Sequence, residues 1–105
     1  MEGKFSVVTL CGSTKFKEQF LETQRRLTLE GKIVLSVGLF GHADSEDISV
    51  DQKTMLDKMH LRKIDLADSI YVINVDGYIG ESTGREIEYA ESQGKPIFYY
   101  SDGKL

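Results

Sequence analysis

The sequence of 105 residues has one cysteine, one proline and no long apolar run. Cys11 alone cannot form an internal disulfide, and Pro96 alone, without any Ser-, Gly- or Pro-rich tract, gives no segment that resembles a linker. The first apolar run is too short for a secretory signal, and no stretch approaches the roughly 18 apolar residues that a membrane span needs. We therefore expect a single cytoplasmic domain over residues 1–105, with no membrane partner.

Positive charge is also scarce. The 13 Lys and Arg residues are scattered among 17 Asp and Glu residues, and the net charge is -4. Binding to nucleic acid needs a basic face that neutralises phosphates, so we expect no nucleic-acid partner. This balance leaves room for a small anionic ligand, because such a ligand needs only a few donors. The hydrophobic fraction of 40% is ordinary for a globular chain.

What is present is a regular alternation of short apolar runs and helical segments. Apolar runs rich in β-branched residues predict buried strands over residues 5–11, 33–37, 69–75 and 97–100. Helical spacing and helix stop signals predict helices over residues 14–30, 50–66 and 82–93. In the second of these helices we expect Met55, Leu56 and Met59 to face the core. Residues 38–49 hold two glycines and several small polar residues, which predicts a loop over one end of the sheet.

The order of these elements is β-α-β-α-β-α-β, which favours right-handed crossovers and a parallel sheet with helices on both faces. We therefore expect a flavodoxin- or Rossmann-like three-layer α/β sandwich, with four or five strands in the order 2-1-3-4. In this order the chain changes direction between the first and third strands, and ligands bind outside the carboxyl ends of the strands at such a point. The turns at residues 12–14 and 76–82 reach this place.

The turn after the first strand combines a glycine with two hydroxyl residues. Gly12 permits a tight turn and a close approach of the backbone. Ser13 or Thr14 can cap the following helix, whose first amides favour an anion, and Lys15 adds a nearby cation. The same residues also fit an ordinary helix cap. We expect Cys11, just before the turn, to be a small buried residue rather than a nucleophile.

The third helix carries a carboxylate at the edge of its buried stripe. At 100° per residue, Thr83, Ile87 and Ala90 lie on the buried side, and Glu86 lies at its border in the first turn. A carboxylate at the border of the core can act as an acid, a base or a nucleophile. Gly84 leaves space for a ligand against the helix backbone. Thr83 and Glu86 also fit a capping box, in which the glutamate returns to the cap amide.

These turns resemble those of the nucleoside 2-deoxyribosyltransferase superfamily, and above all those of the 2'-deoxynucleoside 5'-phosphate N-hydrolases. The shared features are a CGS-type turn with a basic residue two positions on, an Ala-Asp pair before the third strand, a G-x-E-[IL]-x-x-A helix and a Gly-Lys-Pro stop. They correspond to Cys11, Gly12, Ser13, Lys15, Ala67, Asp68, Gly84, Glu86, Ile87, Ala90, Gly94, Lys95 and Pro96. The resemblance spans nearly the whole chain.

The resemblance implies that Glu86 attacks the anomeric carbon of a 2-deoxyribosyl group as the base leaves. The transition state would resemble an oxocarbenium ion, and a covalent ester would follow, as in a retaining glycosidase. Residues of the two turns would hold the substrate: Gly12, Ser13, Thr14, Lys15, Gly80, Glu81, Ser82 and Gly84. The resemblance implies no cofactor and no metal, a nucleoside or nucleotide as partner, and a homodimer as the assembly.

The sequence departs from the family pattern before the Ala-Asp pair. His60 stands where the family has an aspartate. A histidine with an ordinary pKa near 6.5 could protonate a leaving purine as a catalytic residue, bind a phosphate or only end a helix. Asp65 could supply the missing carboxylate, although its spacing differs from that of the family. The turn before Glu86 is longer than in the hydrolases, which brings Tyr78 and Ile79 near the expected base pocket.

We therefore expect hydrolysis or transfer at the N-glycosidic bond of a (deoxy)nucleoside or a nucleoside 5'-monophosphate. The departure at His60 motivates a second interpretation, a nucleotide-binding or regulatory module without turnover. A third is cleavage of the nicotinamide bond of NAD, although no second nucleotide subsite is evident in so compact a chain. His42 and its acidic neighbours in the loop over residues 38–49 are expected to form an exposed acidic loop rather than a metal site.

Overall fold

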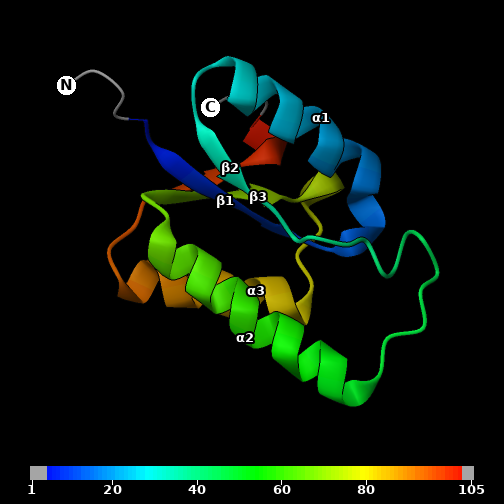
Figure 1. The fold of residues 1–105 in the computed structure, drawn as a ribbon. Coiled ribbons are helices and arrows are strands. Elements are labelled where there is room, and N and C mark those ends of the chain that lie inside the picture. Colours follow the sequence, from blue (N-terminus) through cyan, green and yellow to red (C-terminus); the bar gives the residue numbers. More distant parts are fainter. Residues whose placement is uncertain (1–4, 103–105) are drawn as a thin grey trace.

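The computed structural model describes residues 5–102, and all the strands and helices expected from the sequence are present (Figure 1). The strands are β1 (Val7–Gly12), β2 (Ile33–Leu35), β3 (Ser69–Ile73) and β4 (Ile97–Tyr99). The α-helices are α1 (Lys17–Leu29), α2 (Val50–Leu66) and α3 (Glu81–Ser92). Three short 3-10 helices are η1 (Thr14–Phe16), η2 (Val75–Gly77) and η3 (Tyr100–Asp102). None of the helices within residues 5–102 has the length and apolar character needed to traverse a bilayer.

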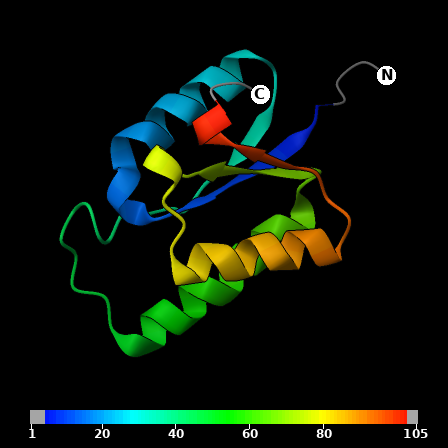
Figure 2. The ribbon, with the colours of Figure 1, turned by 180° about the vertical axis from the view of Figure 1, so that it is seen from behind.

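The four strands form one parallel sheet in the order β2-β1-β3-β4, which confirms the predicted order. In register, Thr9 of β1 pairs with Leu35 of β2 and with Ile70 of β3. Helix α1 covers one face of the sheet, and α2 and α3 lie together on the other face (Figures 1 and 2). The predicted three-layer α/β sandwich is therefore confirmed, with four strands in the described part of the chain.

Two apolar clusters fill the spaces on either side of the sheet. The cluster on the α1 side contains Val8, Leu10, Phe20, Leu27, Tyr71 and Ile73. The cluster on the side of α2 and α3 contains Cys11, Ile64, Ile70, Val72 and Ala90. Successive side chains of a strand point to opposite faces, so Leu10 faces α1 while Cys11 faces α2 and α3. This alternation places the thiol on the face that also carries Glu86.

Helix α2 has the predicted bounds, but the prediction that Met55 and Met59 face the core is wrong. Their side chains are 51% and 45% exposed. The buried residues of this helix are His60 and Ile64, with Leu56 partly buried. These three follow the i, i+4, i+8 spacing of one helical face. A histidine therefore occupies the stripe that the methionines were expected to fill, and the two methionines lie about 100° to the side.

The turn after β1 forms as the sequence predicts, with one local difference. The backbone of Gly12 has a φ of 148°, and a Cβ added there would lie 2.8 Å from the carbonyl oxygen of Ile73 in β3. Only glycine fits this close approach. The helix expected from residue 14 begins instead as η1, where Ser13 Oγ accepts a hydrogen bond from the Lys15 amide, and α1 starts at Lys17.

Candidate active site

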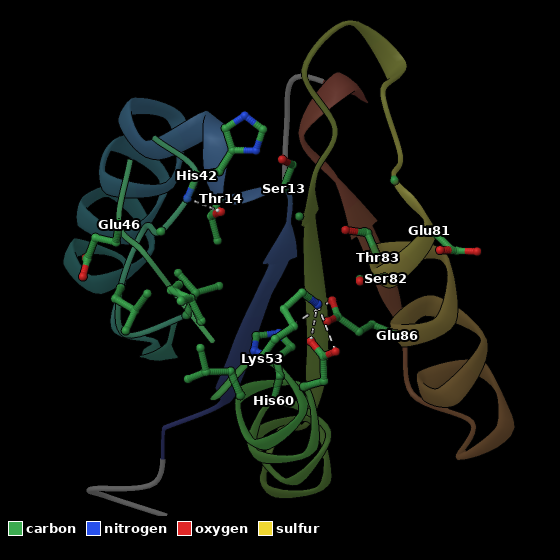
Figure 3. A pocket seen from close by; sticks show the side chains of 18 of the residues that line it. Ser13, Thr14, His42, Glu46, Lys53, His60, Glu81, Ser82, Thr83 and Glu86 are labelled. Carbon is green, nitrogen blue, oxygen red and sulfur yellow. Dashed lines mark hydrogen bonds and ion pairs between the residues drawn. The ribbon is translucent and has the colours of Figure 1, made fainter. Parts of the chain in front are cut away.

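A cavity of about 570 Å³ opens at the carboxyl ends of β1 and β3, where the strand order reverses (Figure 3). Its wall comes from the turn after β1, the loop over residues 38–49, residues 53–60 of α2, the turn before α3 and the start of α3. The volume lies in the range of sites for small molecules. Of the residues predicted from the sequence, the wall includes Gly12, Ser13, Thr14, His60, Gly80, Glu81, Ser82 and Glu86.

Two predicted residues, Lys15 and Gly84, are not part of the wall. The Lys15 ammonium lies over the ring of Tyr78, 3.7 Å from its centre, in a cation–π contact. Tyr78 does line the cavity. Gly84 has open space around it, since a Cβ added there would meet no heavy atom within 4 Å. Lys15, the cation expected near a bound anion, therefore contacts the Tyr78 ring at the edge of the site.

Glu86 lies at the base of the cavity, and its side chain is only 15% exposed. It belongs to α3, whose buried residues Thr83 and Ala90 lie on the same side of the helix. The N-cap residue of α3 is Gly80, which offers no side-chain cap, so the alternative of a Thr83–Glu86 capping box is wrong. In Figure 3, Glu86 points toward His60 and Lys53 of α2. The prediction of a carboxylate at the edge of the core is confirmed.

His60 and Cys11 complete a buried group at this base. His60 Nε2 lies 3.8 Å from Glu86 Oε1 and 3.5 Å from Cys11 Sγ. Cys11 is fully buried and does not line the cavity, as expected for a structural cysteine. The Cys11 thiol is thus close to both the imidazole and the carboxyl group. Strand β1 and helices α2 and α3 contribute one side chain each.

Burial shifts the three groups toward their neutral forms. It raises the pKa of Glu86 to about 7, although a hydrogen bond from Cys11 acts in the opposite direction, and Asp57 raises this pKa further. Burial, with the charge of Lys63, lowers the pKa of His60 to about 4, against a backbone hydrogen bond with Leu10. Burial and the neighbouring Glu86 raise the pKa of Cys11 well above its usual value. Near neutral pH, His60 is therefore uncharged and Cys11 remains a thiol.

These protonation states decide what the group can do. Glu86 changes its charge close to neutral pH, which suits a base or a nucleophile. His60, with a pKa of about 4, holds no extra proton near pH 7. The expectation that it protonates a leaving purine therefore does not fit its environment. Its place beside Glu86 suits a positioning role.

The three side chains are also donors of the kind that bind a transition metal. Their Sγ, N and O ligand atoms all lie within 4.8 Å of one another, and they form the only such group found over residues 5–102. An ion would have to displace the proton of a buried thiol and its contact with the imidazole. We therefore treat the group as a hydrogen-bonded network. The acidic loop around His42 forms no comparable group within the same residues.

Sequence reasoning missed Lys53 and Asp57, which both line the cavity. Lys53 Nζ lies 3.0 Å from each carboxylate oxygen of Asp57 (Figure 3). Lys53, Asp57 and His60 are four and three residues apart, so they share one face of α2. That spacing was visible in the sequence. Asp57, one turn before His60, brings a carboxylate to the part of the helix where this chain has His60 in place of the family's aspartate.

Asp65 does not supply that carboxylate. It is absent from the cavity wall, and its Oδ1 accepts hydrogen bonds from Tyr89 of α3 and from Gln93, the C-cap residue of that helix. Its Oδ2 accepts one from Arg62. The bonds from Gln93 and Tyr89, and the one from Arg62, lower the pKa of Asp65 to about 2. Asp65 thus joins α2 to α3 on the outside of the molecule.

The loop over residues 38–49 forms one wall of the cavity, which the sequence did not predict in detail. Its lining residues include His42, Glu46 and Asp47. The His42 amide donates a hydrogen bond to Thr14 Oγ1 over 3.2 Å, and Lys17 of α1 binds Asp44 over 2.9 Å. These contacts hold the loop against the turn after β1. The expected exposed acidic loop is present, and part of it faces the site.

No protein-family model and no curated protein matches this chain. The resemblance to the nucleoside 2-deoxyribosyltransferase superfamily therefore stays a prediction.

Proposed function

We propose that this protein cleaves or transfers at the N-glycosidic bond of a nucleoside-type substrate, with Glu86 as the nucleophile. The observation that carries the proposal is a carboxyl group at the base of a cavity of about 570 Å³, at the point where the strand order reverses. Burial gives this group a pKa of about 7. A weakly hydrated carboxylate that ionises near neutral pH is suited to attack carbon.

In the proposed reaction, a Glu86 carboxylate oxygen forms a bond to the anomeric carbon. The bond between that carbon and the base nitrogen breaks, and its electron pair stays on the base, where a neutral base takes up one proton from solvent. Water, or the nitrogen of a second base, then attacks the same carbon and releases Glu86 as a carboxylate. With water, one proton passes to solvent and the sugar keeps its configuration, as in retaining glycosidases.

Other residues of the wall have roles that suit a sugar. Ser13, Thr14, Ser82 and Thr83 bring hydroxyl groups to the cavity, and hydroxyls can both donate and accept hydrogen bonds. No side chain caps α3, so its first amides stay free for a ligand oxygen. Glu81 is a weaker candidate for positioning the sugar, since its side chain is 91% exposed and points away from the cavity (Figure 3).

The test is release of free base from a panel of nucleosides and their 5'-monophosphates, followed by chromatography. We expect Glu86→Gln to lose at least about a thousandfold in rate, because the nucleophile is removed. Glu88→Gln is the matched control, since Glu88 is an exposed residue of the same helix outside the cavity wall. Equal activity of Glu86→Gln and wild type, or no base release from any substrate, would contradict the proposal.

A second candidate is a nucleotide-binding module without turnover. It is favoured by one observation, the lack of a proton on His60 near neutral pH, because a neutral purine leaves readily only when it is protonated. Calorimetry that detects tight nucleotide binding, with no base release over hours, would support this candidate. We also propose that the protein is cytoplasmic and forms a homodimer.

A further inference from the structure

We infer that the cavity selects N-glycosides whose base carries a positive charge, such as pyridinium ribosides, over nucleoside 5'-phosphates. The inference rests on the proposed function and names the substrate class of the same site. It follows from the charges of the wall and from the side chains to which the nearby cations are bound.

The charged side chains of the wall are mostly acidic. Five of the lining residues carry carboxyl groups, Glu46, Asp47, Asp57, Glu81 and Glu86, and one carries an ammonium group, Lys53. The side chains of Glu46 and Glu81 point outward (Figure 3). Asp57 and Glu86 are partly buried, whereas the other three are exposed at the rim. A cleft lined by charges of one sign attracts ligands of the opposite sign and repels those of its own sign. This arrangement favours a cation and opposes a phosphate dianion.

The cations close to the cavity already have partners. Lys53 is bound to both oxygens of Asp57, and Lys15 lies over the Tyr78 ring. Arg85 lies 3.8 Å from Glu81 and lines a smaller, neighbouring cavity that shares Asp57, Ser82 and Glu86 with the first. Side chains recognise a phosphate most strongly through charge-assisted hydrogen bonds from Lys or Arg. A phosphate here would have to take Lys53 from Asp57 and would leave that carboxylate unpaired.

The chemistry of the leaving group also favours a base that carries a positive charge. A neutral base needs a proton when its bond to the sugar breaks, and the imidazole beside Glu86 has no proton to spare near neutral pH. A quaternised base needs none. When Glu86 forms its bond to the anomeric carbon, the electron pair of the broken bond neutralises the ring charge. The base then leaves as a neutral molecule, and no proton donor is required.

The test is a set of four probes that varies base charge and phosphate independently: nicotinamide riboside, its 5'-monophosphate, inosine and inosine 5'-monophosphate. Binding is measured by calorimetry with Glu86→Gln, which prevents turnover, and base release with wild type. We expect nicotinamide riboside to bind at least about tenfold more tightly than its 5'-monophosphate, and also more tightly than inosine. Inosine 5'-monophosphate should bind most weakly.

The second arm uses Asp57, whose removal should weaken the selection against phosphate. Asp57→Asn removes one negative charge and frees Lys53 for a phosphate, so the preference for nicotinamide riboside over its 5'-monophosphate should shrink by about fivefold or more. Asp51→Asn is the matched control. Asp51 lies two residues before Lys53 on the same helix and outside the cavity wall, and its loss should leave the preference unchanged.

The outcomes separate this inference from the proposed function. Tighter binding of either 5'-monophosphate than of its nucleoside, tighter binding of inosine than of nicotinamide riboside, or no binding by any probe overturns the inference. Glu86-dependent release of base from 5'-monophosphates alone overturns it as well and leaves the proposed function standing. Binding in the expected order without base release supports the selection of cations and contradicts the proposed reaction.

Discussion

At the scale of single residues, the central feature is a carboxyl group and an imidazole that lie 3.8 Å apart and both favour their neutral forms. Attraction between opposite charges would raise the pKa of His60 and lower that of Glu86. Both pKa shifts run in the opposite directions, because burial is the largest influence on each group. Between about pH 4 and 7 the pair therefore holds an uncharged acid beside an uncharged base.

This feature predicts the pH dependence of the proposed reaction. The rate of base release from nicotinamide riboside should rise with pH through about 7, where Glu86 ionises. Asp57→Asn should move this rise to lower pH, because the charge of Asp57 contributes to the raised pKa of Glu86. The measurement is kcat/KM as a function of pH for both proteins. A rate that does not change from about pH 6 to 8 would contradict the role of Glu86 as nucleophile.

The same shifts predict opposite effects on stability. As pH falls from 6.5 toward 4, the unfolded chain protonates His60 and the folded chain does not, so this group makes the protein less stable at low pH. As pH rises from 4.5 toward 7, the unfolded chain ionises Glu86 while the folded chain keeps its proton, so this group makes the protein less stable at high pH. Between pH 4.5 and 6.5 the two effects oppose each other.

Replacing either Glu86 or His60 should remove its own effect on stability and leave that of the other residue. Relative to wild type, the free energy of unfolding of Glu86→Gln should increase with pH between 4.5 and 6.5, by up to about 1.4 kcal/mol per pH unit. That of His60→Gln should decrease over the same interval. Urea unfolding at a series of pH values measures both slopes. If the unfolding free energies of the two variants, relative to wild type, changed with pH in the same direction, the opposite effects of Glu86 and His60 would be refuted.

At the scale of elements, the sequence was informative wherever a pattern is local. The strands, the strand order and the bounds of α2 followed from apolar runs, stop signals and alternation. The rotation of α2 did not, because Met55 and His60 compete for the buried face and only packing against β1 and α3 decides between them. The loop over residues 38–49 was recognised as a loop, but its contact with Thr14 depends on residues 28 positions apart.

The residues of the candidate site also differ in whether a local sequence pattern could identify them. Glu86 could be placed by the helical period, and Gly12 by the conformation that a tight turn requires. The family pattern does not single out Asp57 and Lys53, because its spacing from the Ala-Asp pair marks only His60. The engagement of Lys15 with Tyr78 could not be foreseen, since it joins a turn after β1 to a turn before α3.

Replacing Gly12 in the turn after β1 and Gly84 in α3 by alanine should have opposite effects on the free energy of unfolding. Gly12→Ala should lower the free energy of unfolding by about 2 kcal/mol or more, because the added methyl would lie 2.8 Å from the Ile73 carbonyl at a positive φ. Gly84→Ala should raise it by about 0.5–1 kcal/mol, since that helical position has open space. Thermal and urea unfolding of both variants measure the contrast. Equal effects would show that the tight turn does not constrain residue 12.

At the scale of the whole molecule, the homodimer expected from the resemblance stays a prediction. Helix α2 presents Met55, Met59 and Leu66 to solvent as exposed apolar side chains. We expect light scattering to give twice the mass of one chain, and Met55→Glu/Met59→Glu to halve that mass by placing charges on this face. Leu29→Glu on α1, across the sheet, is the control that should leave it unchanged. A wild-type mass of one chain would contradict the homodimer.

The loop over residues 38–49 has a consequence for how such a chain can diverge. It forms a wall of the cavity yet adds no strand to the sheet and no turn to a helix. Codon changes confined to this stretch, at Glu46 or Asp47 for instance, alter the charge met by an incoming molecule and leave the strand register and the position of Glu86 as they are. Selection in a lineage can therefore change which molecules enter the cavity through a single short segment of the gene, at little cost to folding.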